Sequence, residues 1–130
     1  MQVDRRRTLV RGVAIAAGAF GLVTVAAGSM VLFGPSAVQQ RAGDVVAFVV
    51  WFNFWAGFSY VAAAVGIWRG QRWGRWLAWG IAGATALNAL VFAWIVLRGA
   101  AFELRTVFAL TFRAGFWAAI ALVLQRLSSR

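Results

Sequence analysis

The stretch "VVAFVVWFNFWAGFSYVAAAVGIW", residues 45–68, contains no charged side chain. An α-helix needs about 20 consecutive, mainly apolar residues to cross the hydrocarbon core of a bilayer. Asn53 is the most polar residue of the stretch, and apolar or aromatic side chains surround it on both sides. We therefore predict that residues 45–68 form a membrane-spanning helix.

Three other segments are also long and mainly apolar, and polar breaks separate all four. The breaks are "FGPSAVQQRAGD" (33–44) with the only proline, "WRGQRWGRW" (68–76) with three arginines, and "RGAAFELR" (98–105). We predict loops there, and short loops between spans favour antiparallel neighbours. The predicted fold is all-α, a membrane-embedded antiparallel four-helix bundle forming a single domain over residues 1–130. Its helices are expected at about 9–33, 45–68, 76–97 and 106–124.

The composition agrees with a membrane protein and argues against a soluble one. The chain is 63% hydrophobic and only 12% charged, whereas a soluble domain is about 25% charged. "DRRR" before the first apolar run superficially resembles a signal peptide. That run exceeds the 7 to 15 residues of a signal-peptide core, so we expect a retained span.

The arginines predict the orientation of the chain in the membrane. Nine of them lie on the side of the two chain ends, and only Arg41, Arg98 and Arg105 flank the spans on the other side. Basic residues concentrate on the cytoplasmic side, so we expect both termini in the cytoplasm. The nine are Arg5, Arg6, Arg7, Arg11, Arg69, Arg72, Arg75, Arg126 and Arg130.

The same arginines give the chain a net charge of +10. In a soluble protein this charge would suggest nucleic acid as a partner. Beside membrane spans it indicates contacts with anionic lipid head groups at the cytoplasmic face, and we expect no nucleic-acid binding. Tryptophan favours the head-group level, so we interpret Trp68, Trp73, Trp76 and Trp79 as anchors at this face.

Small residues at four-residue spacing predict where the helices touch. In lipid, close approach of backbones drives helix association, and small side chains permit it. Such pairs occur in three of the four segments. They are Ala14 with Gly18, Ala17 with Gly21, Ala78 with Ala82 and Ala86, and Gly115 with Ala119.

A layer of polar side chains is predicted in the outer half of the bundle. At about 1.5 Å of rise per residue, Asn53 and Asn88 lie roughly 13 Å and Arg113 roughly 10 Å below the outer ends of their segments. Asp44 and Glu103 at the outer ends are potential partners for Arg113, and Trp117 could stack beneath its guanidinium. Two interpretations remain open: Arg113 extends towards the outer surface for structural reasons, or the layer holds a ligand.

The residue types that are missing exclude several functions. The chain has no Cys and no His, so disulfide chemistry is impossible and the usual haem, zinc and copper ligands are lacking. Its three acidic residues, which include Asp44 and Glu103, lie outside or at the ends of the spans, unlike the membrane-embedded carboxylate of small four-span drug exporters. We expect no enzymatic activity, no catalytic residue, no metal site and no cofactor.

Two segments resemble a known group of proteins. "VVWFNFWAGFSYVAAAVGIW" (49–68) and "ELRTVFALTFRAGFW" (103–117) are similar to small bacterial inner-membrane proteins with four spans. That family has no assigned activity, so the resemblance implies a fold and a bacterial inner-membrane location only. Its polar positions in this chain are Asn53, Glu103, Arg105, Thr106 and Arg113.

Two functions remain after these exclusions. One is an accessory, assembly or structural subunit of a larger membrane complex, with a membrane-protein partner or further copies of the chain. The other is a small transporter or binding protein for an apolar or anionic ligand, lipid-like or quinone-like, that uses the polar layer. A cavity between the helices would favour the second function, and solid packing would favour the first.

Overall fold

Helices make up nearly all of the computed structural model, which describes residues 1–42 and 47–129. They are α1 (Gln2–Phe33), α2 (Ser36–Ala42), α3 (Ala47–Trp68), α4 (Arg72–Leu97) and α5 (Leu104–Ser128). The described residues include no β-strand. The four long helices have 32, 22, 26 and 25 residues, and each is long and apolar enough to cross a membrane.

Three of these helices extend beyond the apolar segments from which they were predicted. α1 begins at Gln2, α4 begins at Arg72, and α5 continues to Ser128. Backbone hydrogen bonds between residues four apart continue into polar sequence, because they do not depend on side-chain polarity. Arg5, Arg6, Arg7 and Arg126 are therefore helical rather than loop residues.

One helix forms where the sequence predicted only a loop. α2 follows Pro35, whose carbonyl oxygen accepts hydrogen bonds from the backbone N–H of Val38 and Gln39, at 2.9 and 3.2 Å. Proline fixes its own φ near the helical value and so favours the start of a helix. Arg105 Nη2 donates to the Arg41 carbonyl oxygen at 3.1 Å, which ties the end of α2 to the first turn of α5.

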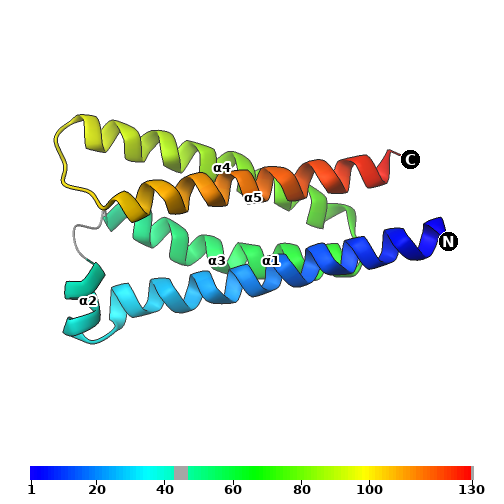
Figure 1. Cartoon of the computed structure of the whole chain (residues 1–130), viewed down its shortest axis with the longest axis horizontal. Helices are drawn as coiled ribbons and strands as arrows, with labels where there is room; N and C mark the ends of the chain where they lie inside the picture. Colours follow the sequence, from blue (N-terminus) through cyan, green and yellow to red (C-terminus); the bar gives the residue numbers. More distant parts are fainter. Residues whose placement is uncertain (43–46, 130) are drawn as a thin grey trace.

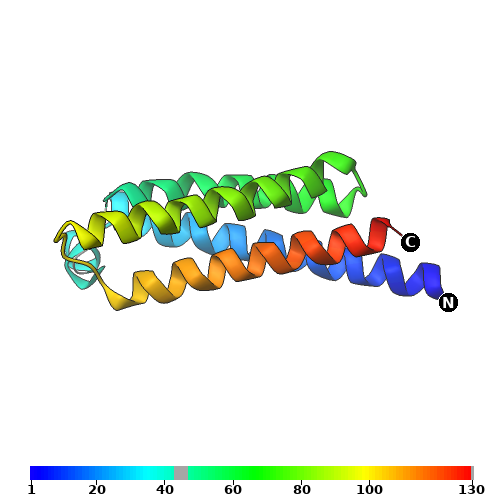
Figure 2. The same ribbon diagram turned by 90° about the horizontal axis from the view of Figure 1, so that it is seen from above.

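The four long helices lie side by side, and the chain reverses direction from each one to the next (Figures 1 and 2). Both chain ends lie at one end of the structure, and α2 lies at the other (Figure 1). The contact between α1 and α3 is the most extensive in the bundle, α4 packs on both α3 and α5, and α1 and α5 approach each other only sparsely. The interior between them is centred on Tyr60 and Trp117, both 0% exposed.

Glycines of α1 and α3 bring these two helices into close contact. A Cβ atom added at Gly57 would lie 2.7 Å from Val25 Cγ2 and 3.2 Å from the Gly21 carbonyl oxygen. Ala17, one turn before Gly21, is completely buried. The small-residue spacing predicted for the first span therefore marks a real contact, because only small residues let the two backbones approach this closely.

The corresponding spacing in α5 has no such role within the chain. Gly115 and Ala119 are exposed, and no atom lies within 4 Å of a Cβ added at Gly115. In α4 the spacing is only partly internal, because Ala78 is completely buried while Ala86 is exposed. Spacing alone could not indicate which side of each helix faces the bundle.

The outer surface of the structure is apolar along all four long helices. Side chains such as Leu22, Trp55, Leu90 and Phe108 are more than half exposed, as expected for surfaces that contact lipid rather than water. All four anchor tryptophans are also exposed, from 37% to 69%. They lie around the turn between α3 and α4, where Gly70 adopts a left-handed φ of 67°. They are Trp68, Trp73, Trp76 and Trp79.

Candidate functional site

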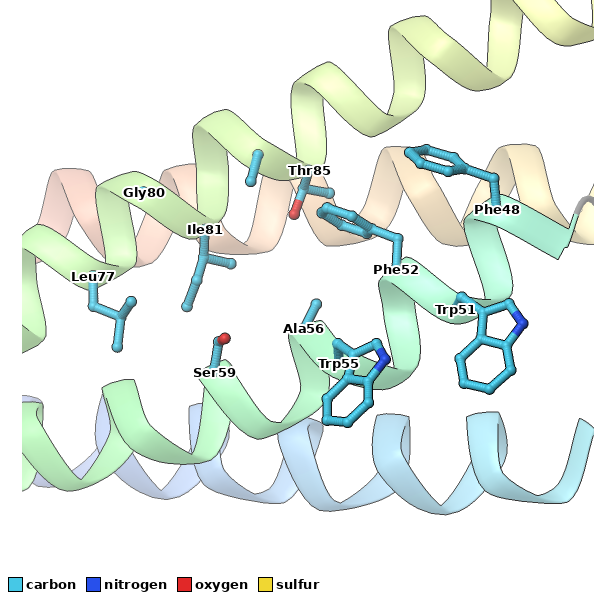
Figure 3. Close-up of a pocket in the computed structure, with 11 residues that line it drawn as sticks. Phe48, Trp51, Phe52, Trp55, Ala56, Ser59, Leu77, Gly80, Ile81 and Thr85 are labelled. Atoms are coloured by element: carbon cyan, nitrogen blue, oxygen red, sulfur yellow. The ribbon is translucent and has the colours of Figure 1, made fainter. Parts of the chain in front are cut away.

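A groove of about 500 Å³ lies between α3 and α4 and opens on the outer surface of the structure (Figure 3). Four aromatic side chains of α3 border it: Phe48 and Phe52 extend towards α4, and Trp51 and Trp55 lie on the side of α3 nearer α1 (Figure 3). The opposite wall comes from α4, with Leu77, Gly80, Ile81, Ala84 and Thr85, and Ala56 and Ser59 of α3 complete the lining. We call this the α3–α4 groove.

The helical repeat explains why these residues share one groove. Residues three and four apart lie on the same face of a helix, and the α3 wall follows this spacing from Phe48 to Ser59. The α4 wall follows it from Leu77 to Thr85. Gly80 contributes no side chain, and no atom lies within 4 Å of a Cβ added there, so space remains between the walls.

Thr85 places a polar group in the lining of this apolar groove. Its side chain is completely buried, and its hydroxyl oxygen lies on the side of α4 that faces α3 (Figure 3). The described residues provide this hydroxyl with no hydrogen bond of ordinary geometry. Less than 1 Å² of this oxygen is accessible, so the hydroxyl lies behind the apolar lining and not on its surface.

Behind Thr85, the centre of the bundle is aromatic and polar at once. The rings of Tyr60 and Trp117 lie 4.7 Å apart between their centroids, and Phe20 stacks on Tyr60 at 5.6 Å. Asn88, one turn after Thr85 on α4, is only 2% exposed. The buried polar atoms that lack a hydrogen-bond partner in the described part of the chain are Thr24 Oγ1, Asn53 Oδ1, Tyr60 Oη, Thr85 Oγ1, Asn88 Oδ1 and Nδ2, and Trp117 Nε1.

Arg113 extends the polar centre on the side away from the α3–α4 groove. Because α5 begins at Leu104, Arg113 lies roughly 13 Å into the helix, deeper than the predicted 10 Å. Its guanidinium carbon is 5.9 Å from the centroid of the Phe20 ring. The Phe20 ring in turn stacks on Tyr60, so the guanidinium borders the central aromatic cluster. The ring under the guanidinium is therefore that of Phe20 on α1, whereas Trp117 packs on Tyr60.

The residues of the predicted polar layer differ in how deeply the structure buries them. Asn88 and Trp117 are buried in the centre, and Asn53 and Arg113 are partly buried. Glu103 precedes the first turn of α5 and is partly buried. Asp44 and the orientation charge Arg130 lie outside the described residues.

Tyr60, Thr85 and the aromatic wall of α3 were not part of the predicted layer. Tyr60 and Thr85 are the completely buried polar residues that connect the layer to the α3–α4 groove. The spacing of the aromatic residues at positions 48, 51, 52 and 55 is a helical-face signal that the sequence already contained. The neighbouring wall on α4 carries no comparable pattern, so the groove itself could not be inferred.

The described residues contain no group of three His, Cys, Asp or Glu side chains that could hold a metal ion. Comparison of the chain with protein-family models, with curated proteins and with solved structures finds no match. The chemistry of the groove and the polar centre is therefore the basis for a functional proposal.

Proposed function

We propose that this chain is a multi-pass membrane protein that binds an apolar small molecule in the α3–α4 groove and carries out no chemical reaction on it. The observation that carries this proposal is the groove itself, with its apolar lining and its four aromatic side chains. Binding sites for small molecules are typically 300–1,000 Å³ in volume, mainly apolar and aromatic, with a few placed polar groups. The groove matches this description in size and in lining.

The dimensions of the groove favour a thin or flat molecule over a protein helix. The wall from Phe48 to Ser59 is roughly 16 Å long at 1.5 Å per residue. A volume of about 500 Å³ over that length corresponds to a cross-section of roughly 30 Å². An α-helix with its side chains is about 10–12 Å wide, which requires roughly three times that cross-section. A hydrocarbon chain or a planar ring system fits the space.

The proposed topology places the groove in the hydrocarbon region of a bacterial inner membrane. The chain would form an antiparallel four-helix bundle with both ends in the cytoplasm, in agreement with the arginine distribution and with the resemblance to small bacterial four-span proteins. Both chain ends lie at one end of the structure (Figure 1). In this arrangement a ligand enters sideways from lipid, since the groove opens on an apolar surface.

Photolabelling tests the proposal directly. The full chain, in lipid nanodiscs, is irradiated with a hydrocarbon probe that carries an alkyl diazirine, and labelled residues are mapped by mass spectrometry. We expect labels concentrated on the walls of the groove, and we expect Ala84→Trp to remove them because the indole fills the space. Ala119→Trp on the exposed face of α5 is the matched control and should leave the pattern unchanged. Equal labelling around all four helices would contradict the proposal.

A role as an accessory subunit is the second proposal, and a different surface favours it. Gly115 and Ala119 form a small-residue strip on α5 that faces away from the bundle. Such a strip allows another helix, from a partner protein or a second copy of the chain, to approach closely. Native mass spectrometry of the protein released from membranes should then show a complex that Ala119→Leu dissociates. A monomer in both proteins would remove this proposal.

A further inference from the structure

A second cavity, of about 350 Å³, lies at the end of the bundle that carries both chain ends and the turn between α3 and α4 (Figure 1). Three arginines from two helices line it: Arg6 on α1, and Arg72 and Arg75 on α4. Gln71, directly before α4, and Ser128, at the end of α5, add polar groups to the lining. We call this cavity the arginine pocket.

Helix geometry explains why these three arginines line one pocket. Arg72 and Arg75 are three residues apart in the first turn of α4, so both lie on one face of that helix. Arg6 and Val10 are four residues apart on α1 and both line the pocket. Three other arginines at the same end of the structure do not line it: Arg7, Arg69 and Arg126.

The arginine pocket has a large excess of positive charge. A guanidinium stays protonated in proteins, so the described lining carries three positive charges and no negative side chain. Asp4 is the only acidic residue in the four long helices and in the turn between α3 and α4. It precedes Arg6 by two positions, and residues two apart do not face each other on a helix. The three cations therefore repel one another until an anion binds between them.

A molecule in the pocket can reach these cations. Arg6 and Arg72 are exposed, and Arg75 is partly exposed. The N–H donors of a guanidinium form a rigid planar fork that matches two oxygens of a phosphate group. Phosphate is therefore the anion that this set of donors suits.

The lining changes from polar to apolar along the bundle, which favours a lipid over a soluble phosphate. Arg6 and Ser128 lie nearest the chain ends, and Val10 and Leu124 each lie four residues further into α1 and α5. The four exposed anchor tryptophans surround the adjoining turn, so this end of the bundle belongs to the head-group level. A phospholipid has the same order of groups, with its charged phosphate outside and its glycerol esters and acyl chains inside.

We propose that the arginine pocket binds the phosphate of an anionic phospholipid, with the glycerol part of the lipid against the apolar side of the pocket. In the proposed topology this is the cytoplasmic leaflet, whose anionic lipids attract basic residues. The inference selects three of the arginines at this end as one specific site. It does not depend on the α3–α4 groove, so either proposal can fail without the other.

Native mass spectrometry of the full chain in a neutral detergent tests this site. Titration with dioleoyl-phosphatidylglycerol should give one tightly bound lipid. Dioleoyl-phosphatidylcholine should bind more weakly, because its choline group cancels the charge of the phosphate. Glycerol 3-phosphate in large excess should not displace the bound lipid. If it binds as tightly as the lipid, the pocket is a site for a soluble phosphate and the lipid assignment is wrong.

Two triple variants separate a specific site from general attraction by charge. Arg6→Gln, Arg72→Gln and Arg75→Gln should each weaken the binding of phosphatidylglycerol about fivefold, and together by at least about thirtyfold. The matched control loses the same three charges outside the pocket and should bind the lipid nearly as tightly as wild type. It combines Arg7→Gln, Arg69→Gln and Arg126→Gln. Equal weakening in the two triple variants would overturn the inference.

Photolabelling of the wild-type protein provides a measurement that does not depend on a variant's folding. Phosphatidylglycerol with a diazirine on its head group is irradiated with the protein in nanodiscs, and labelled residues are mapped by mass spectrometry. Labels should concentrate on Gln71 and Ser128 of the pocket, in preference to Arg7 and Arg126 outside it. Even labelling of all four positions overturns the inference.

Discussion

Gly57→Ala should destabilise the protein, because it adds a methyl group at the closest contact between α1 and α3. The new Cβ atom would lie 2.7 Å from Val25 Cγ2, 3.0 Å from the Val25 backbone nitrogen and 3.2 Å from the Gly21 carbonyl oxygen. Ordinary contacts to a Cβ begin at about 3.4 Å. Valine is rigid at χ1 in a helix, and two of the three neighbours are backbone atoms, so the helices themselves must separate.

The expected cost is about 1–3 kcal/mol of the free energy of unfolding, which is typical of overpacking a well-packed interior. Alanine is also a better helix former than glycine by up to about 1 kcal/mol, and that gain opposes the clash. Gly115→Ala is the matched control, since Gly115 also lies inside a helix and has no neighbour within 4 Å of the added atom. The difference between the two variants isolates the cost of the contact.

Reversible unfolding in mixed micelles of dodecyl maltoside and sodium dodecyl sulfate measures this difference. Gly57→Ala should unfold at a lower denaturant fraction than Gly115→Ala. In a Val25→Ala background, which removes the 2.7 Å contact, the cost of Gly57→Ala should fall by at least about 0.5 kcal/mol. Equal stability of Gly57→Ala and Gly115→Ala would refute the close packing of α1 on α3.

Three further outcomes are expected. Arg113→Leu and Phe20→Leu should be non-additive in thermal unfolding by about 0.5 kcal/mol or more, because the Arg113 guanidinium carbon lies 5.9 Å from the centroid of the Phe20 ring; strict additivity would remove this coupling. Trp68→Leu should lower the free energy of unfolding by about 0.5–1 kcal/mol through loss of the Arg11 guanidinium 5.4 Å from its ring, and should have no such effect in an Arg11→Leu background. Fusions of alkaline phosphatase and of green fluorescent protein to either chain end should give fluorescence without phosphatase activity, and phosphatase activity at one end alone would disprove the proposed orientation.

The sequence predicted the long helices correctly, but it predicted only some of the contacts between them. Long apolar runs such as residues 45–68 predicted four helices long enough to span a membrane, and all four are present. The "FGPSAVQQRAGD" break concealed the short α2, because a helix of seven residues leaves almost no periodic signal. The Ala17 and Gly21 spacing predicted the α1 side of the contact but not its partner Gly57, and the same spacing at Gly115 faces outward.

The apolar composition alone determined that this chain forms long helices suited to lipid. In lipid the backbone N–H and C=O groups of an apolar run must form hydrogen bonds with each other, and a helix allows this within one segment. Only the tertiary structure decided which faces of those helices meet. In a chain that is apolar on almost every side, no contrast between polar and apolar faces marks the interior. The packing of α3 beside α4 therefore decided that Thr85 borders a groove, and the packing of α5 decided that Arg113 lies beside Phe20.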